Sequence, residues 1–178
     1  MFLIDTNVIS EARKGRRADA GVQSFWAAAA RDDTPLFLAA VTIGELRRGV
    51  ELIRHRGDHP QAELLEQWLI DVLETYGDRV LDLDGDAAQI WGRLRVPNPH
   101  NAIDKQIAAI ALLHDLTVVT RNTDDFAGCG VRLLNPFQAP NGRMDVGAQE
   151  AAVAVLRLVD EQPIGLHPHR ARADRPGW

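Results

Sequence analysis

Short apolar runs alternate with longer segments of helical periodicity along the first 138 residues of the chain. Each run has the length and aliphatic content of a buried strand, and turn-forming pairs such as Thr34-Pro35 and Asn135-Pro136 bound several of them. The predicted strands are Phe2–Asp5, Leu36–Val41, Val80–Asp84, Thr117–Thr120 and Val131–Leu134.

Apolar residues between these runs recur every three or four positions, which predicts helices. The clearest helix is Pro60–Tyr76, with apolar side chains at positions 64, 65, 68, 69, 72 and 73. Gly21–Ala30, Asp86–Arg95 and Ala102–His114 are also predicted to be helical. This alternation indicates an α/β fold in which helices cover both faces of a parallel sheet.

The alternation stops after Pro136. The remaining segment contains one predicted helix, Val146–Asp160, and then a tail rich in proline, glycine and arginine that is predicted to be mobile. We therefore divide the chain into a domain of residues 1–138 and a C-terminal extension of residues 139–178.

Composition narrows the class of protein. The chain has 46% hydrophobic and 25% charged residues, which is ordinary for a globular protein. No apolar run reaches membrane-spanning length, and Asp5 interrupts the N-terminal run, so neither a membrane span nor a secretory signal is predicted. Cys129 is the only cysteine. We expect a cytoplasmic protein. Its net charge of −5 argues mildly against nucleic-acid binding, unless bound cations reverse the local field.

Acidic residues stand where predicted strands end. Asp5 ends the first strand, Glu45 lies just beyond the second, and Asp125 follows the fourth. Asp104 lies in the first turn of the helix that precedes the fourth strand. Because ligands of parallel α/β sheets gather at the carboxyl ends of the strands, we expect these four acids to meet at that edge.

Each acid taken singly also has a purely structural interpretation, as a helix cap or a first-turn acid. These alternatives are Asp5 as the cap of a helix starting at Val8, Glu45 in a capping box with Thr42, Asp104 in a weaker box with Asn101, and Asp124 and Asp125 as first-turn acids. Four carboxylates in one crevice would repel one another unless a cation lay between them. Oxygen ligands without His or Cys suit Mg²⁺ or Mn²⁺, and such ions support phosphodiester hydrolysis.

The sequence resembles a known family at several of these positions. The segments are DTNVIS at the N-terminus, TIGELRRGV, the Asp-x-x-Ile-Ala-Ala motif of Asp104–Ala109, and VVTRNTDDF closing with NPF. Together they resemble the PIN-domain ribonucleases, and most closely the VapC-type toxins of toxin–antitoxin pairs, including FitB-like members. The resemblance covers roughly Met1–Phe137. It implies a three-layer α/β/α sandwich with a parallel sheet of about five strands.

The resemblance also implies roles for individual residues. Asp5 and Asp104 would be direct ligands of Mg²⁺ or Mn²⁺, and Glu45 and Asp125 would complete the catalytic pocket. Supporting positions are Thr6, Asn7, Thr120, Asn122, which stands where some relatives have an acid, and Asp124, an alternative to Asp125. The implied partners are an RNA substrate, a cognate antitoxin and a second copy of the chain, with no membrane.

Other charged residues admit two interpretations. Lys105 is interpreted as solvated, with a phosphate contact at the pocket rim as the alternative. Asp82, Asp84 and Asp86 are interpreted as strand and cap residues, not as a metal site. The basic residues Arg13, Lys14, Arg16, Arg17, Arg47 and Arg48 either contact RNA or form solvated surface.

Three other functions were considered. A receiver-like phospho-acceptor module needs an acid beside Asp5 and a Lys after the last strand, and the sequence has neither. An aspartate phosphatase needs Asp-x-Asp, but Asn7 stands at its second position. An RNA-binding or regulatory PIN protein with weak or no cleavage remains the alternative to an active nuclease.

Overall fold

Five parallel strands form one sheet in the order β3-β2-β1-β4-β5, which places the N-terminal strand at its centre. The strands are β1 (Phe2–Ile4), β2 (Leu36–Ala39), β3 (Val80–Leu81), β4 (Thr117–Val119) and β5 (Arg132–Leu134). This computed structural model describes residues 1–138. The predicted helix Val146–Asp160 and the tail after it lie outside the described residues.

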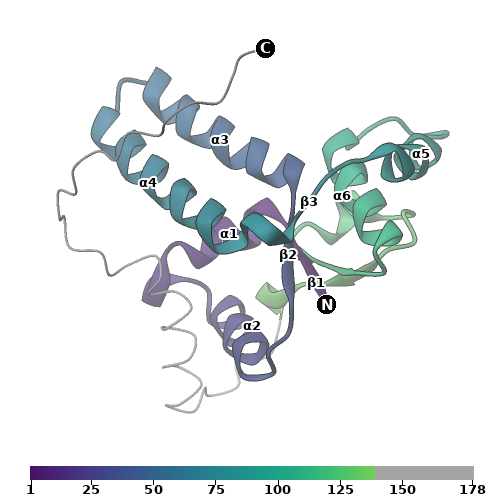
Figure 1. Ribbon diagram of the computed structural model, residues 1–178, viewed down its shortest axis with the longest axis horizontal. Coiled ribbons are helices and arrows are strands. Elements are labelled where there is room, and N and C mark those ends of the chain that lie inside the picture. The colour runs from purple at the N-terminus through teal and green to yellow at the C-terminus, as the bar shows by residue number, and fades with distance from the viewer. Residues whose placement is uncertain (139–178) are drawn as a thin grey trace, which may run out of the picture.

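Helices cover both faces of the sheet, as the alternating pattern predicted (Figure 1). They are α1 (Thr6–Ala12), α2 (Ala20–Arg31), α3 (Ala40–His55), α4 (His59–Tyr76), α5 (Gly85–Leu94) and α6 (Ala102–Leu113). Short 3-10 turns are η1 (Gly15–Arg17), η2 (Gly77–Arg79), η3 (Thr123–Phe126) and η4 (Pro136–Gln138). No helix among residues 1–138 is long and apolar enough to cross a membrane.

Neighbouring strand residues point into two separate cores, because side chains alternate along a strand. Ile4 belongs to the core that α1, α2, α3 and α4 build on one face of the sheet, with Trp26 and Trp68 buried in it. Leu3 belongs to the core on the other face, which α5 and α6 cover. The three-layer α/β/α sandwich is therefore confirmed.

All five strands are shorter in the structure than in the sequence pattern, three of them by one residue and two by more. The strand predicted to end at Val41 stops at Ala39, because α3 begins at Ala40 and continues through a stretch where no helix was predicted. The strand predicted as Val80–Asp84 is only β3, since the Asp84 carboxylate caps α5 by accepting the Ala87 N–H at 2.9 Å. That cap confirms the interpretation of Asp84 as a structural acid.

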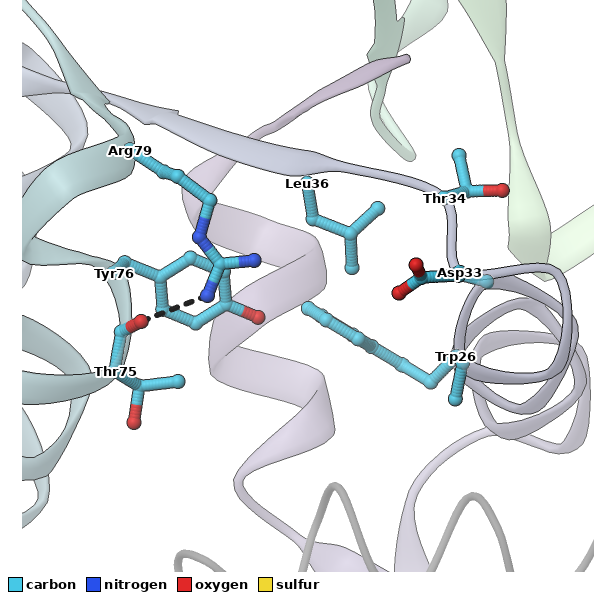
Figure 2. Close-up of a pocket in the computed structure, with 9 residues that line it drawn as sticks. Trp26, Asp33, Thr34, Leu36, Thr75, Tyr76 and Arg79 are labelled. Carbon is cyan, nitrogen blue, oxygen red and sulfur yellow. Dashed lines mark hydrogen bonds between the residues drawn. The ribbon is translucent and has the colours of Figure 1, made fainter.

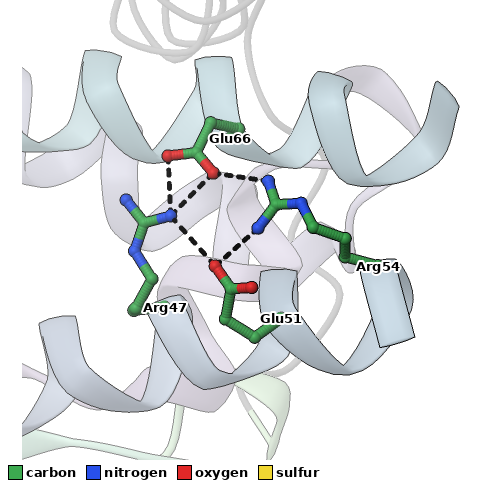
Figure 3. A network of polar contacts seen from close by, with 4 residues as sticks. All are labelled: Arg47, Glu51, Arg54 and Glu66. Carbon is green, nitrogen blue, oxygen red and sulfur yellow. Dashed lines mark hydrogen bonds and ion pairs between the residues drawn. The ribbon is translucent and has the colours of Figure 1, made fainter. Parts of the chain in front are cut away.

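Helices α3 and α4 are joined by a network of two arginines and two glutamates (Figure 3). Arg47 and Arg54 of α3 both bind Glu66 of α4, at 2.6 and 2.8 Å, and Glu51 pairs with both arginines. These side chains are partly exposed, so each pair contributes little alone, but the shared Glu66 fixes how the helices lie side by side. Arg47 is thus bound to acids of its own chain, which weakens its interpretation as an RNA contact.

The last described turn, η4, packs closely on the start of α2. A Cβ atom at Gly21 would lie far inside the contact distance of the Pro136 carbonyl oxygen. Gly21 is therefore required by close packing of two backbones. Gly49, in the middle of α3, has open space around the corresponding position.

We expect Gly21→Ala to lower the free energy of unfolding by about 1–3 kcal/mol, because η4 must move away from α2. The matched control is Gly49→Ala, which should stabilise by up to about 1 kcal/mol through helix propensity. Urea unfolding monitored by circular dichroism measures both changes. Equal effects of the two substitutions would contradict the packing account.

Candidate active site

Asp5 lies at the carboxyl end of the central strand, where it caps α1. Its side chain is 4% exposed. One carboxylate oxygen accepts the Thr6 N–H at 2.7 Å, and the other accepts bonds from the Thr120 hydroxyl and the Asn7 amide, both at 2.6 Å. Asp5 is therefore a helix cap, as one interpretation held, but the helix that it caps begins at Thr6 and not at Val8. The same hydrogen bonds fix the orientation of the carboxylate, so capping does not exclude a role in a site.

The supporting residues named by the resemblance tie the ends of β1 and β4 together. The Asn7 side chain donates to Thr120 Oγ1 at 3.1 Å and accepts the backbone N–H of Arg121 at 3.0 Å. Thr120 Oγ1 also accepts the backbone N–H of Asn122 at 3.0 Å. Asn122 thus contributes its backbone to this arrangement, and its side chain is exposed.

Glu45 reaches the same place from α3. Its Oε2 accepts a hydrogen bond from the hydroxyl of Thr6, the residue that follows Asp5. The predicted capping box with Thr42 is wrong, because α3 begins at Ala40 with Ala39 as its N-cap and no side-chain cap. Glu45 therefore lies beyond the first turn, where its carboxylate is directed to Thr6 and not to the helix terminus.

Asp104 interacts electrostatically with the other three predicted acids. Its pKa is raised from 3.8 to about 6, first by burial and then by repulsion from Asp125, Asp5 and Glu45 in that order of importance. Burial also raises the pKa of Asp5, with a contribution from Glu45, and the hydrogen bonds from Thr120, Thr6 and Asn7 partly offset the effect. The other three carboxylates therefore lie within electrostatic reach of Asp104, and we call the four the acidic cluster.

Asp125 and Asp124 differ in their surroundings. Asp125 is half-buried and accepts a hydrogen bond from the Asn101 side-chain amide at 3.0 Å. The Asp124 side chain is exposed, and the backbone carbonyl of Asp124 accepts the Ala127 N–H at 3.1 Å. Both acids occupy the first turn of η3, as one alternative expected. The weaker capping box of Asn101 with Asp104 is wrong, because Asn101 makes no side-chain cap and donates to Asp125 instead.

No Lys, Arg or His among the described residues forms an ion pair with the acidic cluster. Among residues 1–138, the seven ion pairs within 4.0 Å involve other acids. In the same part of the chain, no group of three or more His, Cys, Asp or Glu side chains is arranged so that it could hold a metal ion. Neutral groups donate the hydrogen bonds that three of the four acids accept, namely Asp5, Glu45 and Asp125.

The interpretation of Lys105 as solvated is wrong. Its side chain is 6% exposed, and its ammonium group donates to the backbone carbonyl of Asn98. Most of α6 from this point to Ala111 is buried, so the helix offers little solvated face there. The methylene stem is packed while the charged end reaches a carbonyl in the loop before the helix.

A cleft of about 210 Å³ lies at the opposite end of the sheet (Figure 2). Trp26, Leu36 and Tyr76 line it, together with Arg79, whose guanidinium lies 5.0 Å from the Tyr76 ring centre. Leu36 begins β2, whereas the acidic cluster follows the ends of the strands. The cleft is therefore separate from the candidate site.

Comparisons with known proteins identify the family of the chain. The PIN domain family matches residues 2–129. Toxin FitB of Neisseria gonorrhoeae is 34% identical over 143 residues, 77% of this chain and 99% of that protein. VapC ribonuclease Y4jK of Sinorhizobium fredii is 32% identical, over 78% of this chain and 99% of its own. The crystal structure of FitAcB from Neisseria gonorrhoeae superposes with a TM-score of 0.64 at 32% identity, covering 78% and 99% of the two chains. The chain therefore belongs to the PIN domain family.

Proposed function

We propose that this chain is a divalent-metal-dependent endoribonuclease and the toxin of a toxin–antitoxin pair. The observation that carries the proposal is the acidic cluster of four carboxylates from separate parts of the chain. Three of them raise the pKa of the fourth, Asp104, and none of the four is in an ion pair among the described residues. Such a grouping costs stability in the free chain, so it requires a functional reason.

The donor set fits Mg²⁺ or Mn²⁺. Both ions prefer hard oxygen ligands, and the acidic cluster contains carboxylates without His or Cys. Mg²⁺ keeps several waters and takes only one or two carboxylates from the protein, so it does not need a shell of three side chains. Asp5 and Asp104 are the proposed direct ligands, and Glu45 and Asp125 the supporting acids.

When bound, the metal supplies an activated water and stabilises charge on a phosphodiester. The chain's own residues do the positioning. Thr120, Thr6 and Asn7 hold the Asp5 carboxylate in one orientation, and the Thr6 hydroxyl also holds Glu45. Because these donors are neutral, they orient the acids without removing the negative charge that attracts a cation.

Partners are proposed from the relatives. FitB and Y4jK are named as a toxin and a VapC ribonuclease, and the similar crystal structure is of FitAcB. By this likeness, the present chain cleaves RNA in the cytoplasm, is blocked by a cognate antitoxin and forms a homodimer. An antitoxin segment carrying arginine would suit so acidic a pocket.

Asp104→Asn should lower the rate of cleavage of total RNA by roughly 100-fold or more. Even groups that only support a metal ligand lower metal affinity or activity by about 10–100-fold when they are removed. Asp5→Asn should give the same loss. The matched control is Asp82→Asn, an exposed acid in the loop after β3, which should leave the cleavage rate unchanged. Cleavage by Asp104→Asn at the parent rate would rule out the assigned ligands, and RNA binding without cleavage by the parent would favour the regulatory alternative.

The choice between the two neighbouring acids of η3 can be tested directly. Asp125→Asn should slow RNA cleavage by about 10-fold or more, because Asp125 is half-buried beside Asp104. Asp124→Asn should have little effect, since that side chain is exposed. The cleavage rates of the two variants at saturating Mn²⁺ measure this difference. A larger loss in Asp124→Asn than in Asp125→Asn would assign the fourth position of the acidic cluster to Asp124.

Stability without metal should depend on the proton of Asp104. Its folded pKa of about 6 exceeds the ordinary 3.8. The contribution of protonated Asp104 to the free energy of unfolding is therefore fully present below pH 3.8 and is lost as the pH rises through about 6. Asp104→Asn lacks this loss. The variant should thus gain roughly 1–2 kcal/mol over the parent between about pH 4 and pH 7.5, allowing for partial solvent screening.

Urea unfolding in EDTA at the two pH values measures this difference. Mg²⁺ should shrink it, because a bound cation stabilises the ionised parent. Identical pH dependence of parent and variant would show that Asp104 titrates normally in the folded chain.

A further inference from the structure

Asn101 contacts the acidic cluster through Asp125. Its side-chain amide donates to the Asp125 carboxylate at 3.0 Å, and the same nitrogen lies 3.5 Å from the Asp125 backbone carbonyl. The two residues are far apart in sequence, so this bond joins the loop before α6 to η3. Asp125 is the acid that contributes most, after burial, to the raised pKa of Asp104.

The backbone of Asn101 is held in a conformation that directs the amide to η3. It is left-handed, with φ 53° and ψ 47°, which asparagine tolerates better than most residues. Its carbonyl accepts the Lys105 N–H at 3.0 Å and so opens α6. On either side, Lys105 donates to the Asn98 carbonyl and the Trp91 indole N–H donates to the Ala102 carbonyl at 3.1 Å.

These bonds give the buried Lys105 a structural role. Its ammonium group and the Trp91 indole anchor the loop from Asn98 to Ala102 on both sides of Asn101. A side chain on an anchored loop loses little further freedom when it forms a hydrogen bond. Asn101 is therefore a preorganised donor.

The hydrogen bond to Asn101 opposes electrostatic repulsion. Asp125 and Asp104 repel each other when both are ionised, which favours turning the Asp125 carboxylate on η3 away from Asp104. We infer that Asn101 is a positioning residue, which keeps the Asp125 carboxylate facing Asp104 so that both can act on one divalent cation. This inference rests on the proposed function and adds a residue that neither the sequence motifs nor the family likeness assigned.

The test removes the amide and keeps the backbone. Asn101→Gly accepts the left-handed conformation without strain. Asp33→Gly is the matched control, because Asp33 also has a positive φ of 46° but lies in the turn before β2, at the opposite end of the sheet from the acidic cluster. Mn²⁺ affinity of the full chain is measured by calorimetry without RNA, next to thermal unfolding in EDTA and RNA cleavage.

Asn101→Gly should weaken Mn²⁺ binding by roughly 10-fold or more, the usual effect of losing a group that orients a metal ligand. Its melting temperature in EDTA should change no more than that of Asp33→Gly. In an Asp125→Ala background, Asn101→Gly should have no further effect on Mn²⁺ affinity, because Asn101 acts through Asp125.

Unchanged Mn²⁺ affinity in Asn101→Gly, or an equal loss in the Asp125→Ala background, would overturn the positioning role. In either case the parent would still bind Mn²⁺ and cleave RNA, so the proposed function would stand. A parent chain that neither binds Mn²⁺ nor cleaves RNA would overturn both.

Discussion

Repulsion among the carboxylates of the acidic cluster is the constraint on which this site depends. The rest of the structure brings these groups together and supplies neutral hydrogen-bond donors to hold them. Asp5 shows how hydrogen bonds offset the cost of burying a charge. Burial raises its pKa, and three hydrogen-bond donors cancel part of that rise. The two apolar cores offset the free energy lost to burying these charges and to their repulsion, and they fix the strands and helices that carry the acids.

Much of this arrangement could be predicted from the sequence. The five apolar runs gave the five strands, and parallel pairing then required Asp5 and the segment after β4 to meet at one edge. The dual nature of Asp5 was also predictable, because Asp-Thr-Asn after a buried strand is both a cap and a set of polar groups at a sheet edge. The places of the acids at strand ends predicted that they would be grouped, and the resemblance to PIN proteins supplied the roles of individual residues.

Other features depend on tertiary contacts that leave no local pattern. Thr42 and Glu45 have the spacing of a capping box, but β2 stops early and α3 starts before Thr42, so the box cannot form. Lys105 has the character of a surface residue, yet the loop before α6 folds over it. Asn101 resembled a cap because it stands three residues before Asp104. Its actual bond to Asp125 joins two elements that sequence spacing does not relate.

Helix α3 carries Glu45 in its first half and the arginines that bind Glu66 of α4 further along (Figure 3). The Glu45 carboxylate is therefore carried by a regular helix that is tied to α4 by ion pairs, and not by a loop. The long helices thus have a use beyond covering the sheet, because α3 also carries an acid to the Thr6 hydroxyl.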